Sequence, residues 1–307
     1  MEIPREGKEV VLEVEGKEVK LTNLSKPFWP ELGLTKANLL QYYADVHEAI
    51  LPHIADRAMV MRRYPDGAHG KSFFMKRAPA GRPAWVETLR IEHGSGNVID
   101  FPVISDLPSL LWVVNLGCID LNPWYSRKDD IDRPDYLHFD LDPGEAGFAQ
   151  VRHTALAVHA ALTELGMPSY VKTSGSKGAH VYVPIVRGPI QKEVWTFAKK
   201  LAWTLAEKRP ELATAEYVKA KRPRGRVLID YNQNRWGSTL ASVYSVRPHK
   251  RAAVSAPVTW EELEAGCELE DFRMDNVPAR VREKGDLWAP LAPSAGGRFR
   301  LESVADE

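Results

Sequence analysis

The stretch His138-Phe139-Asp140-Leu141-Asp142-Pro143-Gly144 alternates apolar and acidic side chains and then ends in Pro-Gly, which predicts a β-strand that stops at a turn. Because successive side chains of a strand point to opposite faces, Phe139 and Leu141 should be buried while Asp140 and Asp142 share the other face. Two carboxylates on one face repel each other unless a cation lies between them, and divalent cations prefer oxygen ligands. The alternative is that Asp142 only opens the Asp-Pro-Gly turn, a common use of Asp.

A third carboxylate stands at the end of another apolar strand, predicted over Val227-Leu228-Ile229-Asp230. If the two strands are neighbours, Asp230 lies beside the acidic pair. Three carboxylates on adjacent strands predict a site for two divalent cations, which clamp the attacking and leaving oxygens of phosphoryl transfer. Taken alone, Asp230 is equally a turn residue at the end of a strand.

Between these acidic segments lies a glycine-rich run, Lys172-Thr173-Ser174-Gly175-Ser176-Lys177-Gly178-Ala179-His180. Glycines let backbone amides approach an anion, Ser174 and Ser176 offer hydroxyl groups, and Lys177 adds positive charge, as in a phosphate-binding loop. The order of residues is not that of a Walker loop. A glycine-rich hairpin turn is the structural alternative, and His180, at the start of the strand that follows, would then be a structural histidine.

Basic and aromatic residues gather in two further places, around residues 62–77 and just before Asp230. Such clusters neutralise phosphates, and exposed aromatic rings stack on bases, so they favour a nucleic acid over a small ligand. The alternative is a solvated basic face with at least one of Phe73 and Phe74 in the core, because the two point to opposite sides of a strand. The candidate phosphate contacts are Arg62, Arg63, Lys76, Arg222 and Arg224.

The overall composition limits the kind of binding. The 307 residues include 41 Lys plus Arg and 41 Asp plus Glu, so binding through bulk positive charge is excluded and any phosphate site depends on local clusters. The N-terminus lacks the apolar segment of a signal peptide, and no stretch reaches the roughly 20 apolar residues of a membrane helix. Two distant cysteines predict neither a disulfide framework nor a zinc site. We therefore expect a cytoplasmic protein without membrane contact.

The predicted elements alternate between strands and helices, which indicates a mixed α/β (α+β) fold. We expect two lobes of one compact catalytic unit, residues 1–134 and 135–290, followed by a loose tail over 291–307. The main predictions are a hairpin over 10–21, a helix from the N-cap Thr35 to Leu51, strands at 59–63, 72–76 and 242–246, a paired segment over 88–104, helices at 108–116, 151–165 and 194–205, and a capping box at 259–262.

Together these motifs resemble those of the archaeo-eukaryotic primase superfamily, and the sequence around them is similar to the polymerase domain of bacterial ligase D. The three family motifs are matched in order by Asp140-Leu141-Asp142, Ser174 to His180, and Asp230. Further segments that resemble this polymerase domain are Leu21-Thr-Asn-Leu-Ser-Lys26, Tyr64-Pro-Asp-Gly67, Phe73-Phe-Met-Lys76, Asn115-Leu-Gly-Cys-Ile119 and Tyr244-Ser-Val-Arg-Pro248. The resemblance extends from about Leu21 to Leu263.

The resemblance implies a fold with two antiparallel-rich sheets flanked by helices around a central cleft. It also implies a template-directed polymerase that uses two Mg²⁺ or Mn²⁺ ions and NTPs or dNTPs at gaps or broken DNA ends. The implied roles are metal binding and catalysis for Asp140, Asp142 and Asp230; nucleotide binding for Ser174, Ser176, Lys177, His180 and Arg247; 5′-phosphate binding for Asn23, Lys26 and Lys36; and template stacking for Phe73 and Phe74.

Two positions depart from the family pattern. Asn122 stands where relatives commonly have His before Pro-Trp, which affects metal preference or ribose selection, and Gln233 stands where some relatives carry a basic residue. The implied partners are a Ku-like end-binding protein and a DNA ligase, with the bacterial nucleoid as the location. Two alternatives stay open: a primase that starts chains without a primer, and a non-catalytic module that binds or bridges DNA ends.

Overall fold

The computed structural model describes residues 1–301, and these divide into two compact units that each contain several chain segments. The first unit contains residues 1–124, 241–254 and 273–286, and the second contains 125–240, 255–272 and the segment from Leu287 onward. This division differs from the continuous lobes expected from the sequence. Long-range hydrogen bonds explain why the chain returns to the first unit: Tyr42 Oη donates to the Tyr244 carbonyl at 2.7 Å, and Tyr244 Oη donates to Asp286 at 2.7 Å.

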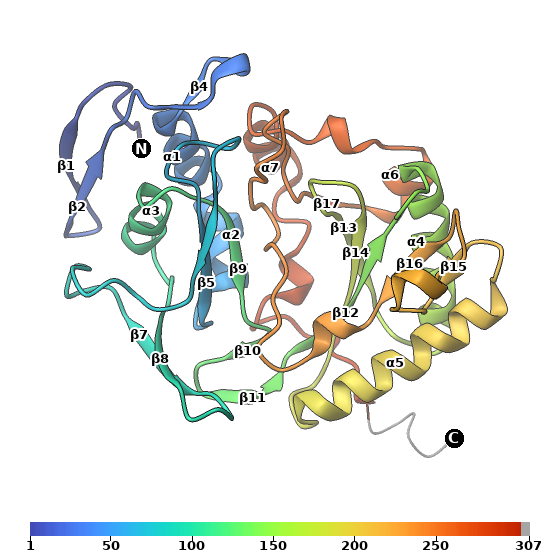
Figure 1. The fold of residues 1–307 in the computed structure, drawn as a ribbon. Coiled ribbons are helices and arrows are strands. Elements are labelled where there is room, and N and C mark those ends of the chain that lie inside the picture. The colour runs from blue at the N-terminus through green and yellow to red at the C-terminus, as the bar shows by residue number, and fades with distance from the viewer. Residues whose placement is uncertain (302–307) are drawn as a thin grey trace. The chain divides into compact units, whose positions relative to one another are not determined.

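The first unit is built from short antiparallel sheets and small helices (Figure 1). Its central sheet has the strand order β6-β5-β9. The strands are β1 (Glu9–Val14), β2 (Lys17–Thr22), β3 (Pro27–Trp29), β4 (Leu34–Thr35), β5 (Met59–Arg63), β6 (Phe73–Met75), β7 (Thr88–Glu92), β8 (Val98–Pro102) and β9 (Cys118–Pro123), and the helices are α1 (Lys36–Asp45), α2 (His47–Ile54), α3 (Leu107–Asn115) and α7 (Val277–Lys284).

The second unit is organised around a six-stranded sheet in the order β15-β16-β12-β14-β13-β17. Its strand pairs are antiparallel except for β15 with β16. The strands of this unit are β10 (Ser126–Arg127), β11 (Asp130–Pro134), β12 (Tyr136–Asp142), β13 (Tyr170–Thr173), β14 (Ala179–Pro184), β15 (Ala213–Thr214), β16 (Val227–Asp230) and β17 (Pro257–Val258), and the helices are α4 (Phe148–Glu164), α5 (Gln191–Lys208) and α6 (Trp260–Glu264).

The central strand β12 has one apolar and one polar face, as its alternating sequence predicts. Leu137, Phe139 and Leu141 are completely buried, whereas Asp140 and Asp142 retain exposure on the opposite face. The helices α4 and α5 contact this strand and present apolar stripes, and Figure 1 shows α5, in yellow, running beside β12 and β16. The apolar alternation therefore anchors the sheet and leaves the acidic face for other functions.

Several local predictions are confirmed, including the β1–β2 hairpin, the strand that carries Asp140 and Asp142 and the capping box in which Thr259 Oγ1 accepts from Glu262 N. Three are wrong in detail. The helix that begins after Thr35 breaks at Val46, because the Val46 backbone leaves the helical region and α2 starts anew. Residues 242–246 form no strand; only Val246 makes a single bridge, because Tyr244 has a positive φ of 60° that interrupts extended backbone.

The third difference concerns the expected tail. Residues 291–301 are attached to the second unit: Phe299 forms a parallel bridge with Ile185 and accepts a backbone hydrogen bond from Val186 N at 2.8 Å, and Leu301 is buried. The remainder of the predicted tail, 302–307, lies outside the described residues. Within residues 1–301, no helix has both the length and the hydropathy needed to span a membrane.

Candidate active site

A row of four polar residues crosses the six-stranded sheet of the second unit. Asp230 on β16 is directly opposite Asp140 on β12, Asp140 is opposite His180 on β14, and His180 is opposite Lys172 on β13. Directly opposite residues in antiparallel strands have their Cβ atoms about 4.5–5.5 Å apart. The strand register therefore brings two of the predicted metal ligands and one predicted nucleotide-binding residue together.

Asp140 and Asp230 form a close pair of like charges. Burial raises the pKa of Asp230, and the negative charge of Asp140 raises it further. Opposing these effects, Asn232 N donates to Asp230 Oδ1 at 2.7 Å and Gln233 Nε2 donates to Oδ2 at 3.3 Å. Gln233 thus holds the Asp230 carboxylate in position. A bound cation would relieve the repulsion between the two acids, so their chemistry fits a hard divalent metal.

Asp142 shares the polar face of β12 but does not join this pair. Its side chain is exposed, and its Oδ1 accepts a hydrogen bond from Gly144 N at 3.1 Å, which is the turn predicted as the alternative role of this residue. Among the described residues, no group of three His, Cys, Asp or Glu side chains is close enough to hold a metal ion. Asp140 and Asp230 therefore supply two neighbouring carboxylates of the kind a divalent metal prefers, and Asp142 must turn away from Gly144 to act as a third ligand.

The glycine-rich loop is folded around the hydroxyl group of Ser174. Ser174 Oγ accepts hydrogen bonds from the backbone N–H groups of Ser176, Lys177 and Gly178 at 3.2, 3.2 and 3.0 Å. These amides therefore point to Ser174, so the amide cradle expected from the glycines is occupied by a side chain of the loop itself. The groups of this loop that can still contact an anion are the serine hydroxyl hydrogens and the Lys177 ammonium group.

Gly178 fixes the position of the loop against the acidic strand. A Cβ atom at this position would lie 2.1 Å from the carbonyl oxygen of Leu141, far inside van der Waals contact. Only glycine lets the loop pass this close to β12. The loop that carries Lys177 is consequently attached directly beside the strand that carries Asp140 and Asp142.

The first unit contains a buried acid that the sequence did not single out. Asp120 on β9 is 1% exposed, and burial raises its pKa, while Arg247 and Arg62 lower it. Arg62 Nη1 lies 4.0 Å from Asp120 Oδ2, and Asn122 Nδ2 donates to the Asp120 carbonyl at 3.2 Å. Asp120 thus sits among the predicted phosphate contact Arg62, the predicted nucleotide contact Arg247 and the atypical Asn122. Its one sequence signal is an acidic residue between the apolar residues Ile119 and Leu121.

The paired phenylalanines of β6 both lie on the surface. Phe73 is 46% exposed and Phe74 is 64% exposed, so neither belongs to the core. The guanidinium of Arg63 lies 5.6 Å from the Phe73 ring centre, and that of Arg62 lies 5.3 Å from the Phe74 ring centre. Exposed rings beside arginines are suited to stacking on bases next to phosphates.

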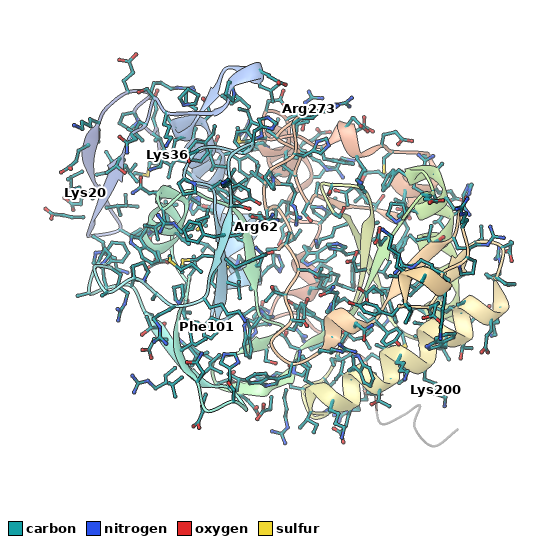
Figure 2. All side chains as sticks on the ribbon, in the orientation of Figure 1. Lys20, Lys36, Arg62, Phe101, Lys200 and Arg273 are labelled. Atoms are coloured by element: carbon teal, nitrogen blue, oxygen red, sulfur yellow. The ribbon has the colours of Figure 1, made fainter. Side chains whose placement is uncertain are left out.

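The structure also brings together the three residues that the family resemblance links to a 5′-phosphate. The backbone N–H of Lys36 donates to the Lys26 carbonyl at 2.9 Å, and that of Lys26 donates to the Asn23 carbonyl at 3.0 Å. Asn23 adopts a positive φ of 54°, which Asn tolerates better than most residues. Lys36, labelled in Figure 2, donates from Nζ to the Thr22 carbonyl at 2.7 Å. Burial, followed by the charges of Lys26 and Arg63, lowers the pKa of Lys36 to about 8.

The remaining predicted phosphate contacts are surface residues. Lys76 and Arg224 are exposed, and Arg222 is half-buried. Nε of Arg222 donates to the carbonyl of Glu216 at 3.3 Å. Beside Arg222, Tyr217 and Val218 are each at least half exposed. This segment of the second unit thus presents basic and apolar side chains together.

The fold and the acidic row define the class of protein as one with a primase-polymerase domain. Residues 35–288 match the family described as the LigD primase-polymerase domain. The multifunctional non-homologous end joining protein LigD of Mycolicibacterium smegmatis is 36% identical over 94% of this chain and 38% of its own length. The bifunctional non-homologous end joining protein LigD of Bacillus subtilis is 30% identical over 87% of this chain and 43% of its own length.

A solved structure agrees with this classification. The polymerase domain from Mycobacterium tuberculosis ligase D, in complex with DNA, superimposes with a TM-score of 0.84 at 31% identity, covering 91% of this chain and 99% of that one. The chain therefore belongs to the LigD primase-polymerase domain family. It spans about two fifths of the length of the curated relatives that it matches.

Proposed function

We propose that this chain is a template-directed nucleotidyltransferase that adds NTPs or dNTPs to a primer 3′-hydroxyl at gaps or broken DNA ends during non-homologous end joining. The observation that carries the proposal is the direct cross-strand pairing of Asp140 with both Asp230 and His180. A pair of carboxylates beside a histidine and a serine-lysine loop supplies metal ligands and triphosphate contacts on one sheet face. Family membership, shown by the match over residues 35–288, is consistent with this activity.

In this proposal Asp140, Asp142 and Asp230 hold two Mg²⁺ or Mn²⁺ ions. When bound, such ions would make the primer hydroxyl more acidic and neutralise charge on the triphosphate. Asp142 changes its partner from Gly144 N to a metal, a rotation that its exposure permits. The backbone N–H of Asn232 and the amide of Gln233 keep Asp230 oriented for this role.

The other predicted residues bind the substrates. Lys177 and the hydroxyl groups of Ser174 and Ser176 contact the triphosphate, and His180 donates a hydrogen bond to it. Arg247 contributes a further cation. Charge-assisted contacts of this kind are the strong hydrogen bonds in phosphate recognition.

DNA contacts are assigned to the first unit and to the basic segment of the second. Phe73 and Phe74 stack on the template, supported by the exposure of both rings. Asn23, Lys26 and Lys36 bind a downstream 5′-phosphate, supported by their proximity and by the pKa of Lys36, which burial lowers first and the nearby charges of Lys26 and Arg63 lower next. Lys76, Arg222 and Arg224 bind the backbone phosphates. A Ku-like end-binding protein and a ligase are the partners that this role requires.

The proposal is tested by extension of a labelled primer at a short gap whose downstream strand carries a 5′-phosphate. NTPs and dNTPs are compared in Mg²⁺ and in Mn²⁺, with Asp140→Asn as the inactive variant and Asp275→Asn, an exposed acid paired with Arg273, as the matched control. We expect templated addition by the native and control proteins, loss in Asp140→Asn, and weaker addition when the 5′-phosphate is removed.

The same assay separates the alternatives. No addition in either metal, with DNA binding intact, would contradict the polymerase proposal and favour a module that binds or bridges ends. Synthesis on a template without any primer would favour a primase that starts chains.

A further inference from the structure

The residue at the far end of the polar row, Lys172, is buried in an unusual way. It is 1% exposed, whereas lysine is almost never fully buried without a partner. Its Nζ lies 2.8 Å from Nδ1 of His180 and donates to Oγ of Ser255 at 2.7 Å. Ser255 Oγ in turn donates to the Thr173 carbonyl at 2.8 Å, so a lone pair of this hydroxyl faces Lys172. The amine is therefore held by His180 on β14 and by Ser255, which lies just before β17.

With Lys172 in the ordinary ammonium form of lysine, this arrangement sets where the proton of His180 lies. An ammonium group has three donors and no acceptor, so Nδ1 of His180 accepts its hydrogen bond. In a neutral imidazole the proton is then on Nε2. Nε2 lies 3.4 Å from Oδ1 of Asp140, on the side of the ring away from Lys172. His180 thus presents an N–H group, rather than a lone pair, toward the acidic pair.

We propose that Lys172 is a positioning residue that fixes the Nε2-protonated form of His180 and aims its N–H group at a phosphate oxygen of the incoming nucleoside triphosphate. This inference rests on the proposed function for its substrate, while the His180 tautomer is a property of the folded protein alone. Lys172 does not touch the substrate: it acts through His180, and Ser255 holds it in place. A histidine with its lone pair facing the site would repel phosphate instead of binding it.

The tautomer is measured first, without nucleotide, by nitrogen NMR of protein labelled in its histidine rings. The His180 signals are assigned from their absence in His180→Gln. We expect the native spectrum to show a protonated Nε2 and an unprotonated Nδ1 for His180. Lys172→Met should shift these signals toward the other tautomer, whereas Lys200→Met, an exposed lysine on α5 labelled in Figure 2, should leave them unchanged. A native Nδ1-protonated ring, or signals unaffected by Lys172→Met, would overturn the inference.

The second readout is the split between KM and kcat in gap filling. Loss of one hydrogen bond to a charged group should raise the KM for NTP about tenfold to a hundredfold in Lys172→Met. Ser255→Ala, which keeps the lysine, should raise it about fivefold and serves if Lys172→Met does not fold. A purely structural role would lower the melting temperature and the active fraction but leave KM unchanged, and an unchanged KM in both variants would contradict the proposal. If the native protein extends no primer, the proposed function fails while the NMR result still decides the role of Lys172.

Discussion

Lys36 should destabilise the folded protein, because its positive charge is buried and lies near other cations. Its pKa of about 8 in the folded protein lies below the ordinary value of 10.5. At pH 7 the ammonium is charged in the folded and the unfolded state, and the shift of about 2.5 units corresponds to a cost of about 3 kcal/mol. The hydrogen bond that Lys36 Nζ donates to the Thr22 carbonyl opposes this cost, and its loss on replacement removes about 1 kcal/mol of stabilisation.

The replacement Lys36→Met keeps the length of the side chain and removes the charge. We expect it to raise the free energy of unfolding by about 2 kcal/mol at pH 7, the difference between the charge cost and the lost hydrogen bond. The same replacement should abolish the dependence of gap filling on a downstream 5′-phosphate. The assay is urea denaturation at pH 7 beside primer extension with and without that phosphate.

The sign of the pH dependence follows from the lowered pKa. Below pH 8 the full cost of the charge is present, and it is relieved as the pH rises from 8 toward 10.5, because the folded protein then releases its proton first. The stability advantage of Lys36→Met should therefore shrink above pH 8. Lys20→Met is the matched control, since Lys20 is exposed and pairs with Glu9. A Lys36→Met protein less stable than the native one at pH 7, with phosphate dependence intact, would refute this reasoning.

Two further predictions concern the loop beside β12 and the buried acid of β9. Gly178→Ala should lower the free energy of unfolding by about 2 kcal/mol, because its Cβ would overlap the Leu141 carbonyl. The control Gly147→Ala, with open space at its Cβ, should change the free energy of unfolding little. Equal effects of the two replacements in thermal denaturation would argue against the close approach of the loop to β12. Asp120→Asn should change the free energy of unfolding by less than about 1 kcal/mol, because the amide avoids burying a charge. It should nevertheless reduce primer extension, because Arg62 loses its acidic partner. Full activity of the variant would show that Asp120 does not position this arginine.

Local sequence patterns predicted the elements that carry the acids. The alternation of residues 138–142 fixed both the strand and the face of each carboxylate, and the glycine-rich run was correctly placed between two strands. These features depend on neighbours two to four residues apart, which a sequence shows directly. That Asp230 lies opposite Asp140 needed the additional assumption of adjacent strands, which the register confirms.

Features that depend on distant contacts could not be read from the sequence. The burial of Lys172 requires Ser255, which lies 83 positions away, and the fully buried Asp120 is surrounded by residues from separate segments. The alternative that at least one of Phe73 and Phe74 lies in the core is wrong: both are exposed, because β6 is a short edge strand whose rings rest against arginines. Tertiary packing, rather than local propensity, decided each of these positions.

The most direct test of the central claim is incorporation of a single labelled nucleotide opposite each template base in a one-nucleotide gap, comparing the native protein with Asp230→Asn. We predict incorporation that follows the template base in the native protein and a loss of at least about a thousandfold in the variant, because the proposed metal-binding role of Asp230 requires its carboxylate. Incorporation that ignores the template, or equal activity in the variant, would contradict the assignment of these carboxylates to templated nucleotidyl transfer.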